Sequence, residues 1–317
     1  MTGLLFNTIK KIVIVLPFTA LSIPLSSQAL FSQGITAYSK QDKIDTLFVD
    51  AGGFKLFMVK KGNAKGYTVL MEDGMCGSGL RWNSLDDSIA LDHTVITYSR
   101  AFIGKSGKGN PDRQPANVVS ELKTALNNAG IPGPYILIGY SLGGHYTKAF
   151  ARTFPNEVKG ILLIDPLNSV AFYSDYKQNF PELYRIETSA LKEVLTDHPC
   201  YNEIQFGINE SAHGDGSVPE HIPTYMLISS LASELEIQPD QQRIDGQPNN
   251  QDKWDKNNKA AQESWVRHHM KWASGFPNVT TEVTNECTHA MHHERPDIVW
   301  NAFLKLMDDI SNQNLLP

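Results

Sequence analysis

The segment that most constrains the fold of this chain is residues 135–144, which read Tyr-Ile-Leu-Ile-Gly-Tyr-Ser-Leu-Gly-Gly. An apolar run, the pattern Gly-x-Ser-x-Gly and then apolar residues at helical spacing predict a buried strand that turns sharply into a helix. Such a turn exposes the hydroxyl of Ser141 to a base and to backbone donors. A side chain at Gly139 or Gly143 would collide across the turn, which explains both glycines.

Short apolar segments alternate with helical patterns along most of the chain. Residues 44–50 and 54–60 are joined at Gly52-Gly53 and read as an opening hairpin. Runs that are apolar throughout, rather than alternating, are typical of a parallel sheet covered on both faces. The sequence therefore predicts an α/β fold whose further strands are residues 67–71, 94–98, 135–138, 160–164 and 224–228.

Around the turn at Ser141 the chain resembles the α/β-hydrolase fold family, over about residues 44 to 310. It is most similar to serine hydrolases whose third strand ends in an acidic-Gly-x-x-Gly-Ser turn, here residues 72–79, followed by Trp82. The resemblance implies a mostly parallel central sheet with helices on both faces and a cap insertion. It also implies that the N–H of Met75 is one oxyanion donor. The N–H of Leu142, first in the helix after Ser141, is the other.

The same resemblance indicates His289 as the catalytic base. The family order is serine, acid, histidine, so the base lies near the C-terminus. Residues 289–299 look like the family's histidine loop, in which a proline seven residues later, here Pro296, opens the last helix. His292 and His293 stand close by and remain alternatives.

The acid of the site is predicted at Asp165, with Glu234 as the alternative. Family members usually place it in a Gly-x-x-Asp turn after the strand at 224–228, but residues 229–234 here contain no Asp. Asp165 ends the preceding strand. Some haloalkane dehalogenases and pancreatic lipases take their acid from that strand end, and the resemblance to them favours Asp165 over Glu234 or Glu236.

Cysteine and histidine offer two other chemistries. Three cysteines allow at most one internal disulfide, and the sequence leaves the pair open. Cys76 as a nucleophile lacks the strand-turn-helix context of Ser141. His289 and His293 are spaced like two zinc ligands on a helix, but Ala290 stands where such a hydrolase has its glutamate base. We therefore expect no metal and no cofactor.

Two long segments fall between the predicted strands. Residues 167–222 are too long for a plain connection and are rich in aromatic residues, so we expect the cap insertion there. Within them, residues 207–219 are polar and predict a loop. Residues 238–258 are rich in Gln, Asn and Asp, and predict an exposed excursion before a helix that carries Trp265.

The N-terminus has the features of a signal peptide. Lys10 and Lys11 precede an apolar run at 12–25, and Ser27-Gln28-Ala29 is a typical cleavage site. The alternative is an uncleaved anchor, which the prolines within the short run disfavour. Residues 1–29 are thus expected to be a signal peptide, 30–43 a linker and 44–317 one hydrolase domain. Removing residues 1–29 takes away two lysines and no acid, so the formal charge changes from −6 to about −8. This charge disfavours a nucleic-acid partner.

These features together imply an exported serine hydrolase, periplasmic or secreted. The resemblance implies that it cleaves a small-molecule carboxylic ester through Ser141, His289 and Asp165, with an acyl-enzyme intermediate. An aminopeptidase or amidase would share the same three residues. A binding protein that kept the hydrolase fold without catalysis is the alternative from another class.

If the chain is exported and cleaved after Ala29, the mature protein begins at Leu30. N-terminal sequencing of protein recovered outside the cytoplasm checks this. An intact Met1 in the exported form would indicate an anchor instead.

Overall fold

The computed structural model describes residues 44–62, 66–79, 82, 84–167, 169–195, 198, 200–209, 216–232 and 251–313. The expected signal peptide and linker, residues 1–43, lie outside the described residues. The alternative acids Glu234 and Glu236 lie outside them too.

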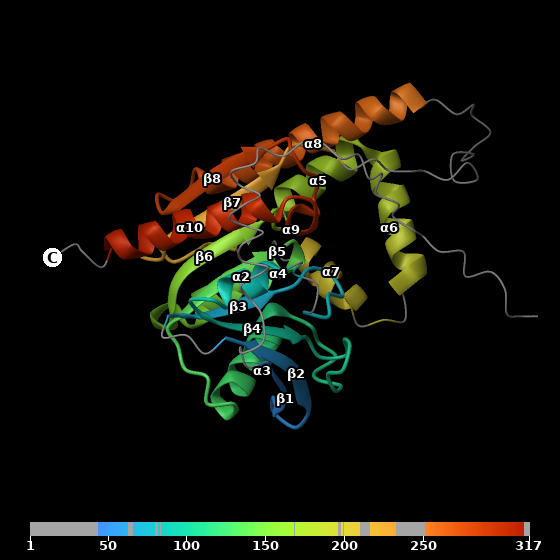
Figure 1. Ribbon diagram of the computed structural model, residues 1–317. Coiled ribbons are helices and arrows are strands. Elements are labelled where there is room, and N and C mark those ends of the chain that lie inside the picture. Colours follow the sequence, from blue (N-terminus) through green and yellow to red (C-terminus); the bar gives the residue numbers. More distant parts are fainter. Residues whose placement is uncertain are drawn as a thin grey trace, which may run out of the picture.

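The described strands form one sheet of eight, in the order β1-β2-β4-β3-β5-β6-β7-β8 (Figure 1). β1 pairs antiparallel with β2, and β2 pairs antiparallel with β4. The other neighbouring strands pair in parallel. The bounds are β1 (Asp45–Asp50), β2 (Lys55–Lys61), β3 (Thr68–Glu72), β4 (Thr94–Ser99), β5 (Tyr135–Tyr140), β6 (Val158–Ile164), β7 (Thr224–Ser229) and β8 (Val279–Thr284).

Helices cover both faces of this sheet. One hydrophobic cluster joins one face to α3, α4 and the end of α8, and a second joins the other face to α2 and α10. The helices are α2 (Leu85–Ile89), α3 (Pro115–Asn128), α4 (Leu142–Thr153), α5 (Val170–Asn179), α6 (Pro181–Leu195), α7 (Cys200–Asn209), α8 (Gln251–Ala273), α9 (Met291–Glu294) and α10 (Pro296–Gln313).

Strand β5 explains why the central runs are apolar throughout. Successive side chains of a strand point to opposite faces of the sheet. Tyr135 and Leu137 pack in the cluster with α3 and α4, whereas Ile136 and Ile138 pack in the cluster with α2 and α10. All four are buried because both faces are covered.

The cap lies between β6 and β7 and comprises α5, α6 and α7. Its aromatic residues pack against one another and against α8. Phe172, Tyr176 and Leu183 form a buried cluster with Ala261, and Trp265 packs against it. In Figure 1, α6 stands on the side of the molecule away from the sheet.

The predicted strands are all present, but three features differ from the expectations. Strand β8 was not predicted, because it is an edge strand whose residues are mostly only partly buried and carry no apolar run. Helix α8 begins at Gln251, inside the expected excursion at 238–258, and α7 extends to Asn209, inside the expected loop at 207–219. The polar residues Asp255 and Lys256 are exposed on α8. The solvent-facing side of this helix is therefore as polar as a loop, which is why the sequence predicted a loop here.

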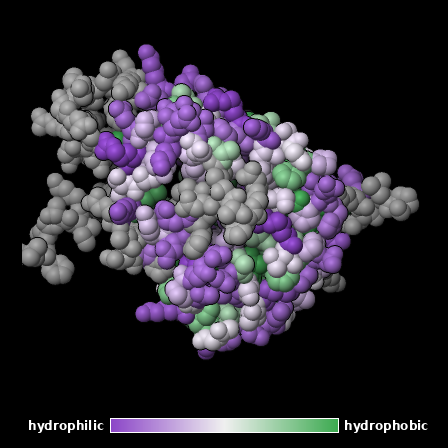
Figure 2. All heavy atoms as spheres, turned by 180° about the vertical axis from the view of Figure 1, so that it is seen from behind, coloured by the Kyte–Doolittle hydropathy of each residue, from purple (hydrophilic) through white to green (hydrophobic). Residues whose placement is uncertain are grey.

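Hydrophilic residues predominate on the face in Figure 2, with apolar residues scattered among them. Among the described residues, no helix has the length and hydropathy needed to cross a bilayer.

The packing of α10 on the sheet can be tested with two leucines of that helix. Leu306 is fully buried against the sheet, whereas Leu304 is 44% exposed. Leu306→Ala should lower the free energy of unfolding by about 2–5 kcal/mol, because it leaves a cavity. Leu304→Ala should change it by less than about 0.5 kcal/mol. Denaturant titration measures both, and equal effects would contradict this packing.

Candidate active site

Ser141 occupies a strained turn between β5 and α4. Its backbone has φ 52° and ψ −122°, which a non-glycine residue rarely adopts. The turn is held against β6, because the Ser141 N–H donates to the carbonyl of Ile164 at 3.0 Å. A Cβ atom at Gly139 would lie 2.3 Å from Thr147 Oγ1, and one at Gly143 would lie 2.2 Å from the carbonyl oxygen of Glu72. Both glycines are therefore required, as the sequence predicts.

His289 lies in the loop between β8 and α9, with its side chain 39% exposed. Its Nε2 is 2.9 Å from Ser141 Oγ, and its Nδ1 is 2.7 Å from Asp165 Oδ2. The loop is fixed by Thr288, whose N–H and hydroxyl both donate to Glu294. The imidazole ring packs against Tyr140, with the ring centres 5.0 Å apart.

The two alternative histidines lie on the short helix α9. His292 is buried, and its ring packs against Trp82 and Tyr140, whereas His293 is exposed. Both ring nitrogens of His289 are engaged by Ser141 and Asp165. This geometry leaves no nitrogen of His289 for the zinc pair with His293.

Asp165 follows β6 and is 1% exposed. Its Oδ1 accepts hydrogen bonds from the Ser229 N–H at 3.0 Å and the Trp265 Nε1–H at 2.9 Å, while Oδ2 faces His289. A buried carboxylate is stable only when its oxygens are hydrogen-bonded, and this one has three partners. The donors come from the end of β7 and from α8, and neither was expected from the sequence. No local signal could have indicated Trp265, which is 100 residues away.

Met75 and Leu142 both lie beside the turn at Ser141. Leu142 begins α4, and Met75 lies in the turn at residues 73–79, which follows β3. Within the part of the chain that the structure describes, neither amide N–H donates a hydrogen bond to another residue. The turn is organised by Asp73, whose carboxylate accepts the N–H groups of Gly74 at 2.7 Å and Gly79 at 3.0 Å.

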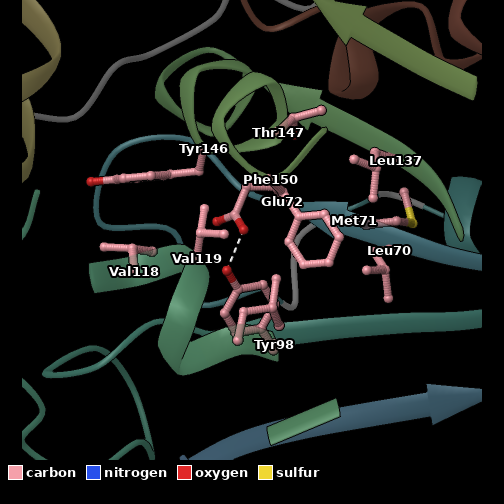
Figure 3. A pocket seen from close by; sticks show the side chains of 11 residues that line it. Leu70, Met71, Glu72, Tyr98, Val118, Val119, Leu137, Tyr146, Thr147 and Phe150 are labelled. Atoms are coloured by element: carbon pink, nitrogen blue, oxygen red, sulfur yellow. Dashed lines mark hydrogen bonds between the residues drawn. The ribbon is translucent and has the colours of Figure 1, made fainter. Parts of the chain in front are cut away.

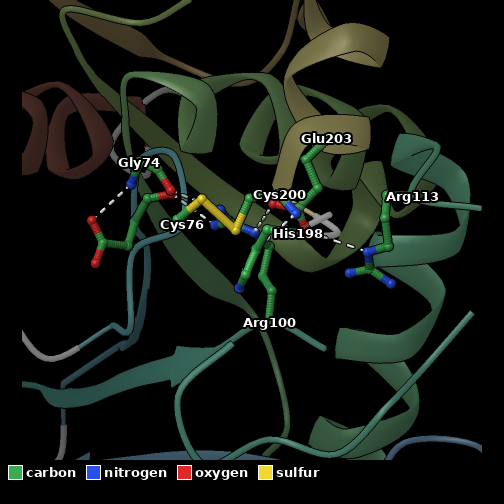
Figure 4. Close-up of a disulfide and its surroundings, with 8 residues drawn as sticks. Gly74, Cys76, Arg100, Arg113, His198, Cys200 and Glu203 are labelled. Atoms are coloured by element: carbon green, nitrogen blue, oxygen red, sulfur yellow. Dashed lines mark hydrogen bonds and ion pairs between the residues drawn. A yellow bond between two sulfur atoms is a disulfide. The ribbon is translucent and has the colours of Figure 1, made fainter. Parts of the chain in front are cut away.

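A buried charge network lies behind this turn (Figure 4). Arg100 contacts Glu72 and Glu203, and Arg113 contacts Glu203 and Glu121. Two guanidinium groups thus face three carboxylates, all buried. Burial raises the pKa of Glu72 to about 7, against the opposing effect of Arg100. Sequence reasoning missed this network, because its members come from five separate segments of the chain.

The structure gives the cysteine pairing that the sequence left open. Cys76 and Cys200 form a disulfide that joins the turn at 73–79 to the first residue of α7. Cys287 is free and buried, and burial raises the pKa of its thiol to about 12. Cys76 is therefore not a free thiol, and the hypothesis that it is the nucleophile is wrong. The Cys76 and Cys200 sulfurs also lie within 4.8 Å of a ring nitrogen of exposed His198, but the two sulfurs are bonded to each other.

A small cavity lies beneath Glu72 rather than at Ser141 (Figure 3). It is lined mainly by apolar side chains from β3, α3 and α4, together with Glu72, Tyr98 and Tyr146. The Tyr98 hydroxyl donates to Glu72 there. Ser141 and His289 do not line this cavity, so it is part of the interior behind the turn.

Comparison with known proteins agrees with this fold. A family model described as alpha/beta hydrolase fold matches residues 67–186. An uncharacterized protein YqjL of Bacillus subtilis is 33% identical over 107 residues, which cover 34% of this chain and 42% of that protein. A (lyso)-N-acylphosphatidylethanolamine lipase of Bos taurus is 29% identical over 102 residues, covering 31% of this chain and 30% of the lipase. These matches span less than half the length of the curated relatives.

Solved structures resemble the chain over more of its length. A putative lipase from Acinetobacter baumannii matches with a TM-score of 0.55 and 16% identity, covering 93% of this chain and 100% of that one. Naproxen esterase from Bacillus subtilis matches with a TM-score of 0.51 and 16% identity, covering 89% and 96%. At such identities the likeness concerns the fold alone. With the observed sheet order and the family model, it shows that this chain has the α/β-hydrolase fold.

Proposed function

We propose that the chain is a serine hydrolase that cleaves a small-molecule carboxylic ester, with Ser141 as nucleophile, His289 as base and Asp165 as the acid that orients it. One observation carries the proposal. Ser141 Oγ lies within hydrogen-bond distance of one ring nitrogen of His289, and the buried Asp165 carboxylate lies within hydrogen-bond distance of the other. This arrangement can activate a serine hydroxyl, which is otherwise a poor nucleophile at neutral pH.

In the proposed reaction, Ser141 Oγ attacks the ester carbonyl while His289 Nε2 takes its proton. The carbonyl π electrons move to oxygen, and the N–H groups of Met75 and Leu142 stabilise the resulting oxyanion. The C–O bond to the leaving alcohol then breaks, and His289 protonates the alcohol oxygen. Water attacks the acyl-enzyme by the same steps and releases the acid, so the chemistry needs no cofactor.

Asp165 supports this reaction by fixing the imidazole. With Oδ2 on the Nδ1–H of His289, the other nitrogen is left to accept the Ser141 proton. The negative charge of the carboxylate also stabilises the imidazolium that forms. The Trp265 and Ser229 donors keep the carboxylate in this orientation.

The ester preference and the export of the protein are parts of the proposal with separate support. The lipase and esterase names of the similar proteins favour an ester over an amide. The Cys76–Cys200 disulfide favours an oxidising compartment, as expected for a chain with the signal-peptide pattern at residues 1–29. Hydrolysis of p-nitrophenyl esters of increasing acyl length, compared with aminoacyl anilides, tests the ester preference.

Ser141→Ala should remove esterase turnover by several orders of magnitude and abolish labelling by a fluorophosphonate probe, because the nucleophile is lost. The fold should be retained, since alanine is small and the backbone of the turn is unchanged. Ser120→Ala, at an exposed serine of α3, is the control and should keep both activity and labelling. Hydrolysis and labelling by a folded Ser141→Ala protein would refute the proposed nucleophile.

Asp165→Asn should lower turnover by about 10³- to 10⁴-fold near neutral pH, because the amide keeps the shape but not the charge or the tautomer preference. Glu234→Gln is the comparison and should change turnover by less than about tenfold. Steady-state kinetics on one p-nitrophenyl ester measures both variants. The reverse pattern would assign the acid to Glu234.

A further inference from the structure

The peptide between Gly74 and Met75 is held by a buried arginine. Arg100 follows β4 and is 1% exposed. Its Nη2 donates to the Gly74 carbonyl at 2.6 Å, and its Nη1 donates to the Asp73 carbonyl at 2.8 Å. A trans peptide is planar, so its C=O and N–H point in opposite directions. Fixing the Gly74 carbonyl therefore fixes the direction of the Met75 N–H.

Its own turn supplies the Gly74 carbonyl with one donor, the Gly77 N–H at 3.2 Å, which is a longer contact than that of Arg100. Glycine has an unusually free backbone, and a Cβ atom at Gly74 would lie 3.0 Å from the ring of Tyr140, so the position favours glycine. The Met75 side chain is 42% exposed and anchors little. A charge-assisted hydrogen bond is roughly twice as strong as a neutral one, and it also polarises the peptide that accepts it.

The cap holds the arginine in turn. Arg100 Nε donates to Glu203 Oε2 at 3.0 Å, and Glu203 lies on α7 with 1% exposure. Arg100 Nη1 also contacts Glu72 Oε1, at the end of β3, at 2.7 Å. Figure 4 shows Arg100 lying between the turn at Gly74 and the helix that carries Glu203. The guanidinium thus connects the cap to the backbone of the turn.

The disulfide makes a second connection between the same two elements. Cys76 is the residue after Met75, and Cys200 is the first residue of α7, three positions before Glu203. Both sides of the Met75 peptide are therefore tied to α7, one through the Arg100–Glu203 pair and the other through a covalent bond.

We propose that Arg100 is a positioning residue for the oxyanion hole, and that cap helix α7 holds it there through Glu203 and the Cys76–Cys200 disulfide. This inference rests on the proposed function, in which the Met75 N–H is an oxyanion donor. The hole is complete only when α7 is docked on the turn. These contacts orient the Met75 N–H, which is the proposed donor to the developing oxyanion. They therefore stabilise the transition state and have little effect on substrate binding.

The test compares Arg100→Lys and Glu203→Gln with wild type on a p-nitrophenyl ester. Lysine keeps the positive charge but lacks the fork that reaches two carboxylates and two backbone carbonyls at once. Arg100→Lys should lower kcat by about 10- to 100-fold and Glu203→Gln by about tenfold, with KM within about threefold of wild type. A trifluoromethyl ketone, which Ser141 converts to an oxyanionic hemiketal, should lose affinity by the same factor as kcat/KM falls.

Glu121→Gln is the matched control. Glu121 is a buried carboxylate of the same network, but it pairs with Arg113 and makes no contact with Arg100. It should lower the melting temperature like Glu203→Gln, with kcat within about threefold of wild type. The inference would be overturned if Glu121→Gln lost as much kcat as the other variants. It would also be overturned if Arg100→Lys and Glu203→Gln raised KM and left kcat unchanged.

Two further measurements separate misfolding and failure of the proposed function from failure of this inference. If Arg100→Lys does not fold, Glu203→Gln decides the result. As a second measurement, reducing the disulfide of the wild type should lower kcat, and reoxidising it should restore kcat. Fluorophosphonate labelling of Ser141 is measured on every protein. A wild type that neither labels nor hydrolyses esters overturns the proposed function and this inference with it. A labelled wild type whose variants keep full kcat overturns the inference alone.

Discussion

The close approach of two backbone segments at Gly143 is the constraint on which the rest of the site depends. A Cβ atom there would lie 2.2 Å from the Glu72 carbonyl oxygen and 2.6 Å from that of Asp73. Helix α4 can therefore begin directly against the end of β3. Because β3 and β5 are parallel neighbours, their carboxyl ends lie at one edge of the sheet. The turn at Ser141 and the turn after β3, which carries Met75, are thus brought to the same edge of the sheet.

The acid side of the site depends on the next strands at the same edge. β6 lies between β5 and β7, so Asp165 at its end lies between Ser141 and the loop after β7. The last residue of β7, Ser229, donates its N–H to Asp165. The segment in which family members usually carry their acid therefore contributes a hydrogen-bond donor here.

The parts of the fold that local sequence determines were predictable, and those that depend on distant contacts were not. The run at 135–138 is apolar because both of its faces are buried, and Gly139 and Gly143 are fixed by a local turn, so the sequence indicates strand, turn and Ser141 together. His289 and Asp165 could be proposed only through family resemblance, since their contacts span 124 residues. The partner of Cys76 is also 124 residues away. Edge strand β8 lacked the apolar run of a central strand.

The buried charges behind the turn are costly in free energy, so a gain in stability is a poor explanation for their presence. Removing charges from water costs several kcal/mol for each ion, and apolar side chains of similar volume often stabilise such a site as well or better. Here three carboxylates surround two guanidinium groups, and burial raises the pKa of Glu72 to about 7. An apolar replacement for Arg100 could fill the space, but it would leave the Asp73 carbonyl without its donor and the Gly74 carbonyl with only the Gly77 N–H. Stability alone therefore does not explain Arg100, whereas fixing the peptide beside the serine does.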